Sequence, residues 1–196
     1  LTAGGYLQDL NYDYDELGNV TYREDATDLN AILREDFNYD KLQRRLDSTV
    51  KRNGVSQPGQ QSYTFAADGN ISTKTGLSGS YVYATRPTQC NAVPGSVTPG
   101  PHAVSLVNNT SYCYDANGNL LRSVVGSTID RNLVWTAYDM TASVRSALAN
   151  TKVGFDYGPN RERIRRLDYA AELNTSADTV THFVGGAEVR WTVNPS

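Results

Sequence analysis

Few side chains in this sequence are of the types that perform covalent or metal chemistry. The two histidines are His102, in a Pro/Gly-rich stretch, and His182, in an expected strand from Thr179 to Val184, and neither has a second ligand at metal-binding spacing. The sequence contains no Gly-x-Ser-x-Gly motif, no Cys-His pairing motif and no phosphate-binding loop. We therefore expect no enzyme activity, no cofactor and no metal site.

The two cysteines, Cys90 and Cys113, are candidates for a disulfide. Cys90 lies in a Pro-rich insert over residues 85–101, and Cys113 lies in a strand-like segment at a position that elsewhere is mostly polar. A bond between them would tie the insert to the sheet and would fit a secreted protein. The alternative is two free thiols, and the sequence leaves both readings open.

Three further sets of residues could contact a ligand. Trp135 and Trp191 are candidates for stacking on a sugar, because an aromatic ring with polar neighbours suits that role. Arg161, Arg163 and Arg165 alternate, so they are expected to line one face of a strand, either in solvent or against an anionic ligand. The aspartates of the repeats described next are interpreted as turn residues rather than calcium ligands or acid–base pairs.

An octet of the form Tyr-x-Tyr-Asp-x-x-Gly-Asn recurs along the chain. Two copies are nearly complete, and a third keeps the aromatic, glycine and asparagine positions. The residues that define these copies are Tyr12, Tyr14, Asp15, Gly18 and Asn19; Tyr112, Tyr114, Asp115, Gly118 and Asn119; and Tyr63, Phe65, Gly69 and Asn70. Weaker copies place the second aromatic at Tyr39, Tyr83, Tyr138 and Tyr157, so successive copies are 18 to 31 residues apart.

Each octet predicts a β-hairpin. Aromatics at positions i and i+2 share one face of a strand. The aspartate suits the first position of a type I turn, where its carboxylate accepts a backbone N–H, and the glycine suits a position of positive φ. Gln43 replaces the glycine in the second copy and the glycine is missing around Tyr138, so we expect looser turns, or turns of another type, at these two places.

Composition supports the same fold class. The chain has 196 residues with 13 Tyr and 16 Gly, a balance typical of strands joined by many turns. We predict an all-β protein in which residues 1–196 form a single array of about seven antiparallel hairpin repeats. A lone hairpin is marginal in water, so neighbouring repeats must share their aromatic faces. The alternative is an ordinary sandwich that happens to use Tyr-Asp turns.

Charge and hydropathy exclude two other classes. The net charge of −3 is unsuited to sequence-independent nucleic-acid binding. The chain has no run of 18 apolar residues, so we expect no membrane-spanning segment. It starts with Leu1-Thr2-Ala3-Gly4-Gly5 rather than Met, and we expect it to be a piece of a longer protein.

The octets resemble the tyrosine–aspartate (YD) repeats of bacterial RHS-type proteins, whose relatives include toxin-complex shell proteins and the extracellular part of teneurins. The resemblance extends to residues 100–104, similar to a "PHAV" element between repeats, and to residues 155–163, similar to a terminal repeat. It implies a spiralling β-sheet that closes into a shell around a C-terminal effector. The Asp-Pro self-cleavage element of such proteins does not appear in this sequence. Seven repeats are too few to close a large shell, so the resemblance implies that this piece alone is a curved, spiralling, open sheet.

The resemblance implies a structural role for a secreted or cell-surface protein. The expected partners are further YD repeats or an effector of the same protein. Two alternatives stay open: an extracellular module that binds glycans or a cell-surface partner, and a filament-forming module whose strand edges pair with copies of itself.

Overall fold

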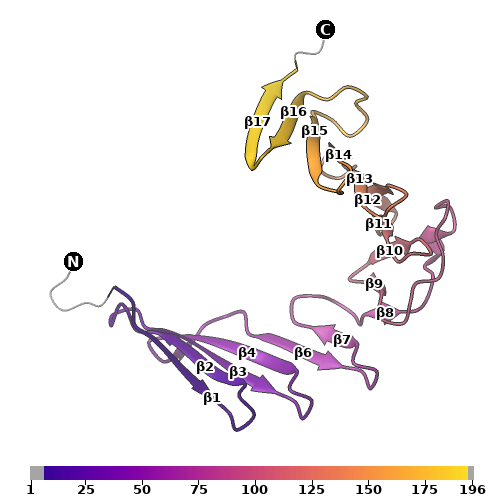
Figure 1. The fold of residues 1–196 in the computed structure, drawn as a ribbon. Helices are drawn as coiled ribbons and strands as arrows, with labels where there is room; N and C mark the ends of the chain where they lie inside the picture. The colour runs from indigo at the N-terminus through magenta and orange to yellow at the C-terminus, as the bar shows by residue number, and fades with distance from the viewer. Residues whose placement is uncertain (1–6, 194–196) are drawn as a thin grey trace. The chain divides into compact units, whose positions relative to one another are not determined.

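The computed structural model describes residues 7–193, which form two compact units divided between Ser80 and Tyr81. The prediction of an all-β fold built from antiparallel hairpin strands is confirmed, since every strand pair is antiparallel and, apart from the short strand β5, strands that follow one another within a sheet are hydrogen-bonded neighbours (Figure 1). That residues 1–196 form one continuous array stays a prediction. None of the described residues belongs to a helix with the length and apolarity of a membrane span.

The first unit is a sheet with the order β1-β2-β3-β4-β6-β7, and β5 pairs with β4. The strand bounds are β1 Leu10–Tyr14, β2 Val20–Asp25, β3 Leu33–Tyr39, β4 Arg45–Arg52, β5 Val55–Ser56, β6 Gln61–Phe65 and β7 Ile71–Lys74. Strands β1/β2, β3/β4 and β6/β7 are the hairpins of three octets. A shift of register next to the last residue of β1, β3 and β6 marks a bulge beside each turn.

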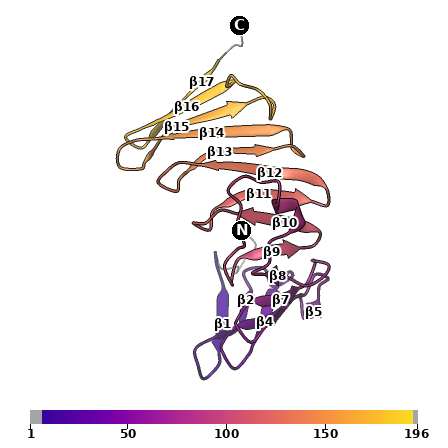
Figure 2. The same ribbon diagram turned by 90° about the vertical axis from the view of Figure 1, so that its right-hand side faces the viewer.

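The second unit is a ten-stranded sheet in simple chain order (Figure 2). Its strands are β8 Val82–Tyr83, β9 Val104–Val107, β10 Thr110–Tyr114, β11 Leu120–Val125, β12 Thr128–Trp135, β13 Thr141–Ser146, β14 Thr151–Tyr157, β15 Arg163–Tyr169, β16 Thr179–Val184 and β17 Ala187–Thr192. The insert lies between β8 and β9 and contains a single 3-10 turn, Thr88–Cys90. The asparagine pair Asn108-Asn109 and the glycine pair Gly185-Gly186 close two tight hairpins with positive φ.

Full burial is rare among the described residues. The largest completely buried side chains are Cys90, Cys113, Ser105 and Ser111, all in the second unit. Cys90, Cys113 and Val93 form a small core with Leu121 packed against it. Many side chains on the strands are half-buried, because in a sheet they are covered chiefly by their neighbours on the same face. Stability must therefore come largely from contacts between strands and between successive hairpins.

Candidate functional site

The turns of the two best octets are nearly identical. In the first, Asp15 Oδ1 accepts the backbone N–H groups of Leu17 at 2.9 Å and Asn19 at 2.8 Å, and Asp15 Oδ2 accepts the Asn19 side chain at 2.9 Å. Gly18 has φ +85°. In the other, Asp115 accepts the corresponding N–H groups of Asn117 and Asn119, and Gly118 has φ +86°. One carboxylate thus satisfies three donors that the turn would otherwise leave to water.

The same backbone turn recurs where the octet is degenerate. In each of six hairpins, the first turn residue donates its N–H to the carbonyl four residues later, and the fourth donates its N–H back to the first. The first and fourth residues are Asp15 and Gly18, Asp40 and Gln43, Ala66 and Gly69, Asp115 and Gly118, Thr136 and Asp139, and Gly158 and Arg161. Every fourth residue has positive φ, from 60° to 89°. These six connections therefore share one geometry.

The expectation of looser turns at Gln43 and near Tyr138 is therefore wrong. Gln43 and Asp139 adopt φ of 61° and 60°, and both keep the two backbone hydrogen bonds. The bulge and the flanking strand pairs determine the backbone path, and a side chain that disfavours the left-handed region is carried into it. In the second copy Asp40 still accepts the N–H groups of Leu42 and Arg44, which helps to hold the turn.

The repeat near Tyr138 is also displaced by three residues from the alignment that the sequence suggested. We call the strand before each turn the outgoing strand and the strand after it the return strand. Trp135, not Tyr138, ends the outgoing strand here, and it faces Thr141 across the bulge as Tyr114 faces Leu120. Thr136 takes the place of the capping aspartate, and its Oγ1 accepts the N–H of Met140 at 3.1 Å. The Tyr138-Asp139 pair matches the third and fourth positions of the octet in sequence, but it lies inside the turn.

The left-handed position offers a matched pair of substitutions. Gln43→Gly is expected to raise the free energy of unfolding by about 1 kcal/mol, because glycine adopts φ of this sign without the penalty of a Cβ. Gly18→Gln is expected to lower it by about the same amount. Urea denaturation of both variants beside the parent chain measures the two effects. Equal midpoints for all three proteins would contradict the assigned turn geometry.

The turn hydrogen bonds lower the pKa of several aspartates. The side chain of Asn19 holds the pKa of Asp15 below its ordinary value, and the backbone N–H of Arg44 does so for Asp40. Asn117 and then Asn119 lower the pKa of Asp139 by donating their side-chain N–H groups to its Oδ1, at 2.9 and 2.7 Å. This last contact joins the turn after β10 to the turn after β12.

These shifts predict lower stability in acid. A carboxyl whose pKa is lower in the folded chain contributes stability above its unfolded pKa of about 3.9, and that contribution disappears as the pH falls through the folded pKa. The urea midpoint is therefore expected to decline below about pH 4. Asp15→Asn should reduce the pH-dependent part of this decline, and an equal decline in that variant would show that the Asp15 turn does not contribute.

Successive hairpins are joined by a second repeated contact, which we call the latch. In the latch, the last residue of an outgoing strand donates a side-chain hydrogen bond to the carbonyl of the first residue of the preceding return strand. The four latches are Tyr39 O–H to Val20 at 3.0 Å, Tyr114 O–H to Val104 at 2.8 Å, Trp135 Nε1–H to Leu120 at 2.9 Å, and Tyr157 O–H to Thr141 at 2.8 Å. The second aromatic of a repeat therefore fastens it to its predecessor.

The latch explains why this position holds tyrosine or tryptophan, each of which combines a large apolar surface with a donor. Phe65 ends its outgoing strand without a donor, and the guanidinium of Arg44 lies 4.4 Å from the centre of its ring. The cation there takes the place of a hydrogen bond. Repetition of Tyr and Trp at this position was visible in the sequence, but the carbonyl that each one reaches was not.

The structure joins Cys90 and Cys113 through a disulfide. Cys90 and Cys113 are 0 % and 1 % exposed, so the bond lies inside the small core of the second unit. The insert is held at a second point, where the N–H of Val97 donates to the carbonyl of Tyr114 at 2.8 Å. The insert between β8 and β9 thus folds back onto the end of the following strand, β10.

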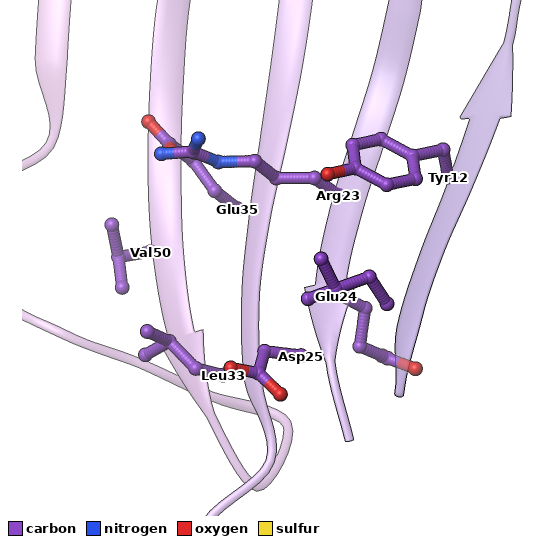
Figure 3. A pocket seen from close by; sticks show the side chains of 8 residues that line it. Tyr12, Arg23, Glu24, Asp25, Leu33, Glu35 and Val50 are labelled. Atoms are coloured by element: carbon purple, nitrogen blue, oxygen red, sulfur yellow. The ribbon is translucent and has the colours of Figure 1, made fainter. Parts of the chain in front are cut away.

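A hollow of about 370 Å³ lies on one face of the first sheet (Figure 3). Tyr12, Arg23, Glu35 and Val50 are cross-strand neighbours along it, and Arg23 Nη2 lies 2.7 Å from Glu35 Oε2. An exposed ion pair of this kind contributes roughly 0.2–1 kcal/mol. The complete lining is Leu10, Tyr12, Arg23, Glu24, Asp25, Leu33, Glu35 and Val50.

The other predicted contact residues are not brought together. Trp135 is half-buried in its latch, whereas Trp191 is 50 % exposed on β17, with its ring centre 4.9 Å from that of His182. The expectation that Arg163 and Arg165 share a face is wrong, because the bulge between Asp156 and Tyr157 shifts the register.

Those two arginines have separate contacts. Arg163 lies over the ring of Phe155, and Arg165 pairs with Asp156 at 2.5 Å. Arg161 occupies the fourth turn position of its hairpin and lies over Tyr138. The three arginines therefore do not form one anion-binding row.

No protein-family model matches the chain, and no curated protein matches it. Among solved structures, the crystal structure of TcdB2-TccC3 is similar at a TM-score of 0.40 and 12 % identity, over 97 % of this chain and 13 % of that chain. The crystal structure of TcdB2-TccC3-TEV is similar at 0.38 and 14 % identity, over 95 % and 12 %. The chain thus spans about an eighth of the length of these neighbours.

Proposed function

We propose that this chain is a structural, non-catalytic segment of a secreted RHS-type protein, in which it forms part of a β-sheet shell that encloses or presents an effector. The observation that supports this most strongly is the latch. Each latched hairpin is fastened to the one before it by a side-chain hydrogen bond to the same backbone position, so the fold grows by adding equivalent units. The addition of equivalent units produces an extended sheet, which suits the wall of a shell better than a single binding pocket.

The distribution of polar side chains supports a structural role. Aspartates and asparagines of the octets satisfy turn donors, and the tyrosines that end strands satisfy neighbouring carbonyls. Several charged residues on the strands pair across the sheet, as Arg23 does with Glu35 and Arg165 with Asp156. These groups are used to hold hairpins together.

The expected partners are further YD repeats, or an effector, of the same polypeptide. The test is to read the gene on both sides of this coding segment and to image its whole product by electron microscopy. Additional octets and a hollow particle with this segment in its wall are the expected results. A product without further octets, forming a solid or fibrous particle, would overturn the proposal.

The glycan-binding alternative now depends on Trp191, since Trp135 donates its indole N–H within the sheet. If it holds, the chain binds a glycan array and Trp191→Ala removes that binding while Trp135→Phe does not. The filament alternative depends on the exposed strand β17. It predicts fibres that lengthen with protein concentration, and a particle of constant size would exclude it.

A further inference from the structure

Strand β1 ends one side of the first sheet, and within residues 7–193 its only hydrogen-bonded neighbour is β2. All five of its residues are exposed. A strand edge of this kind carries backbone N–H and C=O groups that another strand can pair with. The question is whether β1 is built for a particular neighbour.

The second unit contains a close copy of β1 that has such a neighbour. Strand β10 carries the same Tyr-x-Tyr-Asp-x-x-Gly-Asn octet, and it pairs with its return strand in the same pattern, including the shift before the last residue. On its other side lies β9, paired through Thr110 with Val107 and Ser111 with Leu106. Tyr114 then donates its hydroxyl to the carbonyl of Val104.

The two copies differ in what covers their tyrosines. In β10 both Tyr112 and Tyr114 are half-buried. In β1 the equivalent Tyr12 and Tyr14 are 49 % and 56 % exposed, and the Tyr14 hydroxyl has no hydrogen bond to the described residues. Tyr14 is therefore the donor residue of a latch, and residues 7–193 contain no acceptor for its hydroxyl.

We propose that the open edge of β1 is a docking site for the return strand of another octet hairpin. That strand pairs antiparallel with β1 and accepts the Tyr14 hydroxyl at the carbonyl of its first residue. The occupant is a return strand because each of the four latches described above ends on the first residue of one, namely Val20, Val104, Leu120 and Thr141. This inference deepens the proposed function by naming the contact through which a preceding repeat attaches.

The register of the docked strand follows from the two best-defined steps. Continuing the β2–β3 pairing places Val20 across from Asn38, and continuing the β9–β10 pairing places Val104 across from Cys113. In both, the accepting residue faces the residue just before the tyrosine. The first residue of the docked strand therefore faces Asp13. The second residue of the docked strand then faces Tyr12, on the face of the sheet where Leu10 and Tyr12 line the hollow of Figure 3.

The test adds one hairpin to the full chain. A copy of residues 10–32 is placed directly before Gln8, so that the return strand and the loop leading to β3 are reproduced at the new junction. Gln8 then follows the copied loop as Leu33 does in the parent chain, and the first residue of the copied return strand faces Asp13. We expect hydrogen exchange of the outward β1 amides to slow at least tenfold. Tyr14→Phe in the extended chain should reverse much of this protection, whereas Tyr12→Phe should not. Unchanged exchange, or protection insensitive to Tyr14→Phe, overturns the proposal.

A second measurement covers an extended chain that fails to fold. A peptide of residues 18–27, which contains the return strand β2, is titrated into the parent protein and into its Tyr14→Phe variant. Saturable binding at β1 that weakens about fivefold in the variant supports the docking site, and no binding contradicts it. Concentration-dependent self-association that the added hairpin abolishes would make a second copy the occupant instead.

The two proposals fail separately. Protection of β1 in the extended chain, in a protein whose gene encodes no further octets, would leave the docking site standing and remove the shell. A hollow shell in which β1 has a neighbour that does not accept the Tyr14 hydroxyl would remove only the docking site.

Discussion

Replacing both Cys90 and Cys113 by serine is expected to lower the free energy of unfolding of the second unit by about 3 kcal/mol. The disulfide spans 23 residues, and a closed loop of this size removes roughly that much conformational freedom from the unfolded chain. The cluster with Val93 and Leu121 also loses its central pair, which adds to the effect. Urea denaturation followed by far-UV circular dichroism measures the change.

Two controls isolate the disulfide. A reductant should destabilise the parent chain and leave the double-serine variant unchanged. Limited proteolysis should cut the insert over residues 85–101 sooner in the variant, since the covalent tie is lost and the Val97–Tyr114 backbone contact and the packing of Val93 must hold the insert. If the parent and variant unfold at the same urea concentration, the bond makes no net contribution to the fold.

The double substitution Tyr114→Phe/Tyr157→Phe is expected to destabilise the same unit by about 2 kcal/mol, close to 1 kcal/mol for each latch. Each change removes a hydroxyl and leaves the carbonyl of Val104 or Thr141 without its donor, while the apolar ring stays in place. The two latches lie at different hairpins and share no partner, so their effects should add. Thermal unfolding of the single and double variants measures this.

Tyr112→Phe is the matched control, because Tyr112 lies on the same strand as Tyr114 and its hydroxyl makes no hydrogen bond to the described residues. It should change stability by no more than a few tenths of a kcal/mol. If Tyr112→Phe lowers the free energy of unfolding as much as Tyr114→Phe does, the latch is not the cause of the stability lost in the Tyr114 variant.

The latch gives the shell proposal a physical basis. A sheet that grows by identical steps needs a contact that any hairpin can make to any other. A backbone carbonyl is present in every residue, so the acceptor side makes no demand on sequence. Only the donor position has to keep a tyrosine or tryptophan, which fits the wide variation of the other residues between repeats.

In the degenerate repeats, pairing between the strands outweighs the backbone preference of the turn residue. At Gln43 and Asp139 the side chain disfavours the observed backbone, yet the turn is kept. The flanking strand pairs supply enough interactions to outweigh a penalty of about 1 kcal/mol. Sequence reasoning that weighed the turn residue alone predicted the wrong turn there.

The sequence by itself determined where the hairpin turns lie, because the interactions that form a turn lie within five residues of one another. The carboxylate of Asp15, the positive φ of Gly18 and the alternation of Tyr12 and Tyr14 are all local features. The latches join atoms 10 to 19 residues apart, and the two cysteines meet across 23. Register shifts at the bulges decide which residues meet at such distances, and one of them separated Arg163 from Arg165. The strand pairing likewise made Trp135, three residues before Tyr138, the end of its strand. Only the tertiary structure decided these, since a one-residue change of register moves every following side chain to the other face of the sheet.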